Sequence, residues 1–211
     1  MEAAEYKVNF GFTKETFPLG THMCYIYNDD AERKMVIGKY LESGLSANEK
    51  VLALLDVETE AEIDNYLQEI GLAADEHRKR GQLVIKNQRE TYCPDGRFET
   101  QRMIENLKRI YRHGMEEGYT AVRATGEPSW IHHGVPGSEH WRDYEAELNR
   151  LVLDYPYSGL LCGFDARKYS GTLLYDVLSF HPLMVVRGEV LRNPYYISSD
   201  ELRSKDGGKL P

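Results

Sequence analysis

The sequence predicts an α/β protein with a three-layer, doubly wound and mainly parallel sheet. Apolar runs of strand length alternate five times with longer segments whose apolar residues recur every three or four positions. The run VLALL at 51–55 is apolar at every position, which is typical of a strand covered on both faces. Crossover connections between such strands are right-handed, so we expect helices on both faces of the sheet.

The first half of the chain contains three predicted strands and two predicted helices. MCYIY at 23–27 is a short apolar strand that runs directly into acidic residues, and Asp29 or Asp30 can cap the helix that follows. The other two strands are expected at 50–56 and 81–86. The two helices have apolar stripes formed by Ile37, Leu41, Gly44 and Leu45, and by Ile63, Tyr66, Leu67 and Ile70.

The second half of the chain continues the alternation of strands and helices and ends in a predicted hairpin. A loop at 87–98 precedes a third helix, and two more strands are expected at 119–127 and 158–165. A short helix at 172–180 leads to two strands within 183–196 that turn at Arg187-Gly188, which predicts an antiparallel hairpin at the sheet edge. The third and fourth helices carry the stripes Met103, Leu107, Ile110 and Tyr111, and Tyr144, Leu148, Leu151, Val152 and Tyr155.

Composition excludes several classes of protein. The net charge of -8, with no basic stripe, argues against direct nucleic-acid binding. The longest apolar runs, VLALL and LMVV, are far too short to span a bilayer, and the first ten residues do not form a signal peptide. The three widely spaced cysteines suit reduced thiols. We therefore expect a cytoplasmic protein that does not bind membranes.

The residues that follow the predicted strands indicate where a ligand could bind. In an open α/β sheet, ligands gather at the carboxyl ends of the strands. Charged and aromatic side chains there could surround a small polar or amphipathic molecule, or they could only cap helices and pair with one another. The candidate ligand-binding residues are Tyr27, Asp30, Arg33, Asp56, Arg89, Tyr92, Arg123, Glu127, Trp130 and Tyr144.

Two of these candidates support sharper expectations. Arg123 has small or apolar neighbours, so we expect it to be buried and paired with a carboxylate, either Glu127 or Glu145. Such a pair could be structural or could clamp a ligand. Trp130 is expected to be partly exposed, so that its fluorescence would report ligand binding.

Motifs for metal binding and catalysis are missing. His132, His133 and His140 share one loop, but Gly134, Pro136 and Gly137 prevent the helix that an HExxH zinc site needs. Isolated histidines beside strands, at 22 and 181, are more often hydrogen-bonded core residues than ligands. No GxSxG, GxGxxG or GxxxxGK[ST] motif occurs, so we predict no catalytic residue, no metal ligand and no cofactor.

Six segments in order resemble the MEDS domain, the methanogen/methylotroph DcmR-type sensory domain. The similarity runs from about residue 19 to residue 196, so we expect an N-terminal extension at 1–18 and a tail or linker at 198–211 after a domain at 19–197. The segments are GTHMCYIYNDDAERKMVIGKYLESGLSANEKVLALLD, GQLVIKNQRETYCPDGRFETQRMIENL, GYTAVRATGEPSW, YEAELNRL, LLCGFDARKY and SFHPLMVVRGEVLRNPYY.

The resemblance implies a fold similar to the KaiC and RecA-like ATPases in which the phosphate-binding loop is lost. YNDDAERK stands where that loop would be, without its glycines or a lysine in the phosphate-binding position. The resemblance also implies a ligand-sensing module, for which we expect a small organic compound such as a hydrocarbon derivative or a methylated or halogenated molecule. By the same resemblance, we expect this chain to regulate an output domain or a partner protein, and the sequence leaves open whether it forms a homodimer.

Two other functions remain open from the sequence. A residual nucleotide-binding ATPase could use Asp56, Glu127 or Asp165 to hold Mg²⁺, although the missing phosphate loop argues against it. A pure protein-interaction module would use the strand ends as a partner surface and would need no small ligand.

Overall fold

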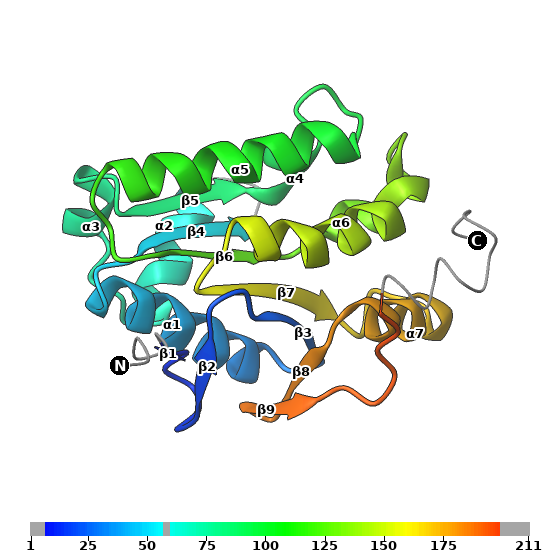
Figure 1. The fold of residues 1–211 in the computed structure, drawn as a ribbon, viewed down its shortest axis with the longest axis horizontal. Helices are drawn as coiled ribbons and strands as arrows, with labels where there is room; N and C mark the ends of the chain where they lie inside the picture. The colour runs from blue at the N-terminus through cyan, green and yellow to red at the C-terminus, as the bar shows by residue number, and fades with distance from the viewer. Residues whose placement is uncertain (1–6, 57–59, 199–211) are drawn as a thin grey trace.

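The computed structural model describes residues 7–56 and 60–198, which form a seven-stranded sheet with helices on both faces (Figure 1). All neighbouring strands are parallel except the last pair, which is antiparallel. The predicted mainly parallel sheet and its edge hairpin are therefore confirmed. In sheet order the strands are β5 (Leu83–Asn87), β4 (Lys50–Leu55), β6 (Val122–Gly126), β7 (Gly159–Asp165), β3 (His22–Tyr27), β8 (Leu183–Val186) and β9 (Glu189–Arg192).

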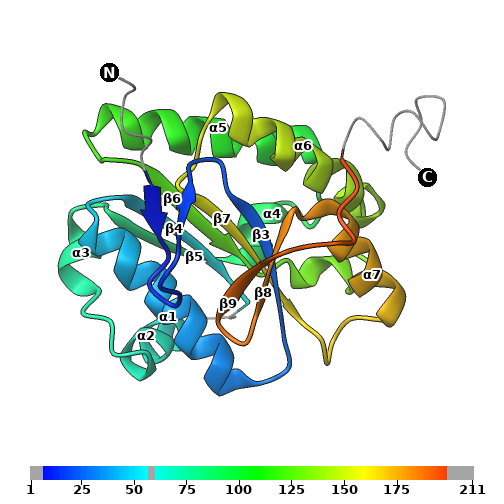
Figure 2. The same cartoon turned by 60° about the horizontal axis from the view of Figure 1, so that its bottom comes forward.

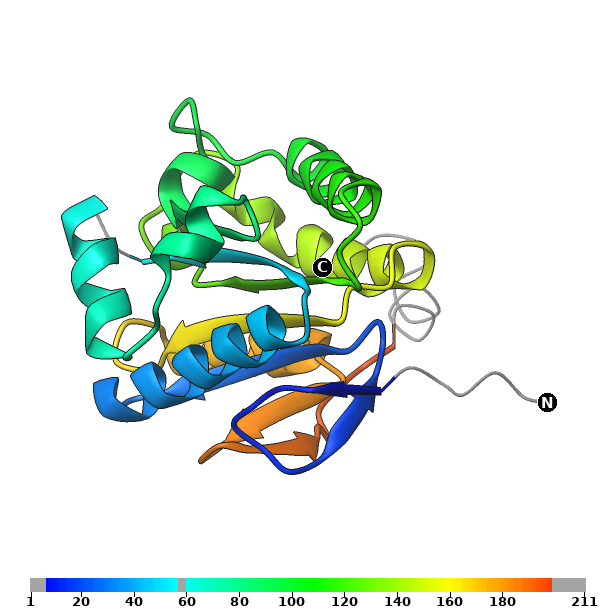
Figure 3. The same ribbon diagram turned by 90° about the vertical axis from the view of Figure 1, so that its left-hand side faces the viewer.

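Helices cover the two faces of the sheet, as Figure 3 shows in a view along the layers. Buried apolar side chains form one core on each face. One core lies under α1 (Asp30–Ser46) and α2 (Glu60–Glu69). The other lies under α5 (Thr100–Glu116), α6 (Trp141–Asp154) and α7 (Gly171–Phe180). Since β4 is sandwiched between the two cores, every one of its residues is buried, as its unbroken apolar sequence predicts.

Short elements connect these layers. The predicted loop at 87–98 contains α4 (Gln88–Tyr92), which Asn87 caps by accepting hydrogen bonds from two backbone amides of its first turn. Further short helices are α3 (Asp75–Lys79), η1 (Ser129–Ile131) and η2 (Ser138–His140). The fourth predicted strand begins at Val122, three residues later than the sequence suggested.

A small hairpin precedes the main sheet. Its strands, β1 (Lys7–Asn9) and β2 (Thr16–Pro18), pair with each other and lie beside α1 (Figure 2). The Phe10 side chain is fully buried, and its ring centroid lies 5.6 Å from that of Tyr40 in α1. The second half of the expected N-terminal extension thus packs against the core. The expected tail lies outside the described residues beyond residue 198.

The parallel strands define two opposite edges of the sheet. We call the edge formed by the carboxyl ends of the parallel strands the carboxyl edge. It is marked by the last residues of β3, β4, β6 and β7, which are Tyr27, Leu55, Gly126 and Asp165. No helix in the described ranges 7–56 and 60–198 is long and apolar enough to cross a membrane.

Candidate functional site

A buried carboxylate occupies the centre of the carboxyl edge. Glu127 follows β6 directly and is 2% exposed. Its Oε1 atom accepts hydrogen bonds from the Tyr27 hydroxyl at 3.0 Å and from Arg33 Nε at 2.5 Å. Its Oε2 atom accepts from the second arm of the Arg33 guanidinium and from the Asp56 backbone amide, the latter at 2.9 Å. Glu127 thus links the ends of β3, β4 and β6 with helix α1.

A second carboxylate, Asp56, lies beside the first. Its Oδ1 atom accepts hydrogen bonds from Ser129 Oγ at 2.6 Å and from Gln88 Nε2 at 3.4 Å. Its Oδ2 atom accepts from Lys168 Nζ at 2.9 Å. Burial alone would raise the pKa of Asp56, but the hydrogen bonds from Ser129 and Lys168 outweigh it and hold the pKa below its ordinary value. Asp56 is therefore ionised at neutral pH.

A third group joins the start of α1 to the end of β7. Arg167 Nε lies 2.8 Å from Asp165 Oδ1, and Arg167 Nη2 lies 2.6 Å from Asp30 Oδ1. The hydrogen bond from the Arg167 side chain holds the pKa of Asp165 below its ordinary value. We call these three groups together the carboxyl-edge network. Its charged and hydrogen-bonding members are Tyr27, Asp30, Arg33, Asp56, Gln88, Glu127, Ser129, Asp165, Arg167 and Lys168.

The electrostatics of this edge do not suit a phosphate. The network holds four carboxylates against three cations. The start of α1 is capped by Asp29, which accepts a hydrogen bond from the Glu32 amide at 2.7 Å, and its first turn also carries Asp30 and Glu32. The helix terminus that could bind an external anion already faces carboxylates of its own chain.

Several buried polar atoms on the segments around the network have no hydrogen-bond partner within the described structure. They are Tyr66 OH, Gln88 Oε1, Trp130 Nε1 and His132 Nδ1. Tyr66 lies against the network, because the Arg33 guanidinium carbon is 5.0 Å from its ring centroid. A buried polar atom without a partner is costly, typically about 1–3 kcal/mol. Water or a bound molecule could satisfy such atoms, by donating to Gln88 Oε1 or by accepting from Trp130 Nε1.

The predicted aromatic residues lie behind the network and are buried. Trp130 is 0% exposed, stacked against Phe98 at a centroid distance of 4.0 Å, and Tyr92 lies 5.6 Å from it. Tyr144 completes the cluster by an edge contact with Tyr92 at 6.0 Å. The expectation that Trp130 is partly exposed is wrong, because Phe98 arrives from a distant loop and covers the indole.

Arg123 is buried as predicted, but it lies on the opposite edge of the sheet. It is the second residue of β6 and pairs in register with Val51 and Gly159, near the starts of their strands. Its Nε atom lies 2.6 Å from Glu49 Oε2. The expected partners Glu127 and Glu145 are therefore wrong, and so is the placement of Arg123 with the ligand-binding candidates.

The structure brings together four of the ten candidates, namely Tyr27, Arg33, Asp56 and Glu127, by direct hydrogen bonds. Asp30 joins them through Arg167, whereas Arg89 is exposed on α4. Sequence reasoning did not select Gln88, Ser129 or Lys168. Lys168 would have been found by extending the strand-end rule three residues beyond Asp165.

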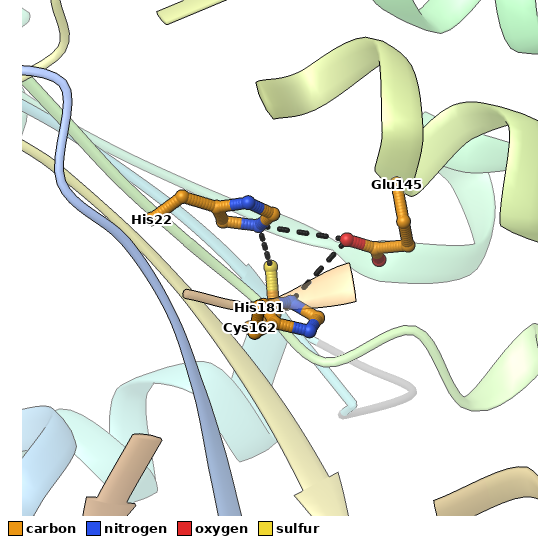
Figure 4. Close-up of side chains that lie close together, drawn as sticks. All are labelled: His22, Glu145, Cys162 and His181. Carbon is orange, nitrogen blue, oxygen red and sulfur yellow. Dashed lines mark hydrogen bonds and ion pairs between the residues drawn. The ribbon is translucent and has the colours of Figure 1, made fainter. Parts of the chain in front are cut away.

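Away from this edge, a groove and a buried cluster of side chains are further candidate sites for a small molecule or an ion. A groove of about 260 Å³ opens between β4, β5 and α5, and basic side chains of Lys50, Lys86 and Arg109 contribute to its lining. Beneath α6 and α7, His22, Glu145, Cys162 and His181 point toward one another, as Figure 4 shows. Both histidines are buried and hydrogen-bonded, as the sequence suggested, but they do not stand alone.

One family model matches the chain, and solved structures share its fold. The family model described as "MEDS: MEthanogen/methylotroph, DcmR Sensory domain" matches residues 21–182. A KaiC-like protein from Pyrococcus horikoshii OT3 is similar in structure, with a TM-score of 0.62 and 13% identity over 85% of this chain and 79% of that one. The flagellar accessory protein FlaH from Methanocaldococcus jannaschii gives a TM-score of 0.54 and 9% identity over 87% and 83%. Among curated proteins, none matches this chain.

Proposed function

Because the chain belongs to the MEDS family of sensory domains, we propose that it is a ligand-sensing signal-transduction domain whose site is the carboxyl edge of the sheet. The observation that carries the proposal is the buried Glu127, held by Arg33 and Tyr27 at the strand ends, with the unpartnered Tyr66 hydroxyl on the ring that packs against Arg33. A preformed polar network whose carboxylates are each paired with a cation can orient a small molecule without needing a charge from it. In this proposal the protein acts in the cytoplasm.

The proposed ligand is a small organic molecule without a strong negative charge. The excess of carboxylates over cations disfavours an anion. The buried rings of Tyr27 and Tyr66 pack beside the Arg33 guanidinium, so apolar surface lies directly next to the charged groups. Unpartnered hydroxyl, amide and imidazole atoms could bind one polar group of the ligand. A hydrocarbon derivative, or a methylated or halogenated compound, fits this combination.

A matched pair of lysine variants tests the location of the site. Lys168 is 47% exposed and binds Asp56, so Lys168→Ala should weaken binding of a hit from a panel of small methylated and halogenated compounds by about 5–30-fold. Lys39→Ala, which breaks an exposed pair on α1, is the control and should bind as the parent does. Calorimetry measures both. Binding that survives Lys168→Ala but is lost in Arg109→Ala would place the ligand in the groove beside α5 and refute the edge site.

We also propose that the domain is not an enzyme, because its carboxylates are already occupied. Glu127, Asp56 and Asp165 each bind a cationic side chain, so none is free to hold Mg²⁺ without losing that partner. A phosphate would need free backbone amides and a lysine at the start of α1, but acidic side chains stand there.

Accordingly, we expect no ATP hydrolysis, and ATP binding no tighter than about 1 mM in the presence of Mg²⁺. Calorimetry and a phosphate-release assay on the full chain measure the two quantities. Magnesium-dependent turnover that disappears in Asp56→Ala or Glu127→Ala would reverse this conclusion, and a residual ATPase would become the better description.

The signal would pass to a regulatory protein or an output domain by contact. Tyr175 on α7 and Tyr195 after β9 are exposed, and their ring centroids lie 6.3 Å apart. In this proposal, the two rings form a surface for such a partner or for a second copy of the chain. Asp165 and Arg167 connect the carboxyl edge to the segment that leads into α7, so a change at the edge can reach this surface.

A further inference from the structure

Four side chains with metal-ligating atoms converge beneath α6 and α7. His22 comes from β3, Cys162 from β7, Glu145 from α6, and His181 from the residue that ends α7. One nitrogen, sulfur or oxygen atom of each lies within 4.8 Å of the corresponding atoms of the others. His22 Nε2 is 3.4 Å from Cys162 Sγ and 3.5 Å from Glu145 Oε2, and His181 Nε2 is 3.3 Å from the same Glu145 oxygen.

The hydrogen bonds at Nδ1 of His22 and His181 determine whether Nε2 of each ring carries a hydrogen or a lone pair. His181 Nδ1 lies 2.7 Å from the Val177 carbonyl, which can only accept, so Nδ1 carries the hydrogen. His22 Nδ1 faces Asn149 Oδ1 at 3.1 Å, and that amide is oriented by its own nitrogen, which donates to the Phe180 carbonyl at 2.8 Å. In the neutral rings, both Nε2 atoms therefore present lone pairs to the centre of the cluster.

The Cys162 thiol can donate to His22 Nε2, but with neutral rings no hydrogen lies between Glu145 Oε2 and His181 Nε2. Glu145 Oε2 and His181 Nε2 are close, yet neither atom makes a hydrogen bond of acceptable geometry with a described residue. The carboxylate and both imidazoles are at most 2% exposed, so water does not screen them. A proton on one imidazole would satisfy two of the four atoms, whereas a central cation would satisfy all of them.

We propose that His22, Glu145, Cys162 and His181 bind one divalent transition-metal ion, with zinc as the best fit. Two nitrogens, one sulfur and one carboxylate oxygen are a donor set typical of tetrahedral zinc. Bonds of about 2.0–2.3 Å in a tetrahedron separate neighbouring ligand atoms by about 3.3–3.7 Å. The three separations of 3.3, 3.4 and 3.5 Å already match this spacing.

Four protein ligands close the coordination sphere, which is the mark of a structural zinc site. The ion would fasten α6 and the end of α7 to the adjacent strands β3 and β7. The hydrogen bonds that His22 Nδ1 and His181 Nδ1 donate to Asn149 Oδ1 and to the Val177 carbonyl would orient the two imidazoles. This site is separate from the carboxyl-edge network, and its metal content can be measured without any organic ligand.

Zinc binding by the full-length chain tests the proposal. After purification with added zinc and dialysis, elemental analysis should find about one equivalent of zinc per chain. Chelation should lower the Tm, and zinc should restore it. Cobalt in place of zinc should give a thiolate-to-cobalt charge-transfer band that is absent in Cys162→Ser. Asn149→Ala, which removes an outer hydrogen bond, should weaken zinc binding by about 10–100-fold.

His140→Ala is the matched control, because this histidine is exposed and lies outside the cluster, and it should keep its zinc. The parent protein carries the main measurement, so a variant that fails to fold does not obscure the result. A parent chain that retains no zinc and whose Tm does not respond to zinc would refute the site. Zinc that remains unchanged in both Cys162→Ser and His181→Ala would also refute it, because the ion would then be bound elsewhere. Either result leaves the carboxyl-edge site untouched.

Discussion

Replacing Arg123 with alanine is expected to lower the free energy of unfolding by about 3–5 kcal/mol. The guanidinium is 0% exposed, and it donates to Glu49 Oε2 at 2.6 Å, to the Tyr40 carbonyl at 2.9 Å and to the Asn9 carbonyl at 3.0 Å. The variant leaves the Glu49 carboxylate buried with only the Ser158 hydroxyl, which donates to it at 2.7 Å. Thermal and urea unfolding measure the effect, with an expected drop in Tm of roughly 10 °C.

Two further variants test whether the loss of stability comes from the buried ion pair. Arg78→Ala removes a comparable but exposed pair with Asp64, so it should change stability by less than about 0.5 kcal/mol. The double variant Arg123→Met, Glu49→Gln removes both buried charges and should recover part of the loss. If Arg123→Ala had the same Tm as the parent, the buried ion pair would not contribute to the stability of the fold.

The second large effect is expected at the centre of the carboxyl edge. Glu127→Ala should lower the free energy of unfolding by about 3–5 kcal/mol, because Arg33 is 14% exposed and would lose its carboxylate. The Tyr27 hydroxyl and the Asp56 amide would lose their acceptors at the same time. The same change should abolish binding of the small organic ligand at concentrations at which the variant is still folded. Unfolding curves and calorimetry on the same samples separate the two effects.

Graded substitutions distinguish the charge of Glu127 from its shape. Glu127→Gln keeps an acceptor oxygen for Tyr27 or the Asp56 amide but loses the charge opposite Arg33, so its stability should lie between those of the parent and Glu127→Ala. Lys168→Ala removes a half-exposed neighbour and should have a much smaller effect on stability. Equal stability of the parent and Glu127→Ala would show that the network does not hold the strand ends together.

Local patterns in the sequence were sufficient for the architecture. The alternation of apolar strands with helical stripes predicted the parallel sheet, because burial on two faces requires an unbroken apolar strand such as β4. The turn at Arg187 and Gly188 was also predicted, and both residues adopt positive φ angles of 52° and 77°. Such a turn suits the twist of an antiparallel pair.

Local patterns also located half of the carboxyl-edge network. Tyr27, Asp56 and Glu127 lie at or directly after the ends of strands, and parallel strands bring their carboxyl ends together whatever the details of packing. The same reasoning from strand ends misplaced Arg123, because the position of a residue along a strand depends on where that strand begins. The ladder of β6 starts at Val122, which puts Arg123 at the opposite edge of the sheet.

Tertiary structure alone decided the contacts between residues far apart in the chain. Trp130 is buried because Phe98 packs on it, and Glu49 binds Arg123 because the start of β4 lies beside that of β6. The cluster of His22, Glu145, Cys162 and His181 has no spacing that a motif could reveal, since each residue belongs to a different element. Periodicity along the chain records which face of an element is buried, whereas the register and crossing of elements determine which side chains meet, and these depend on the packing of the whole domain.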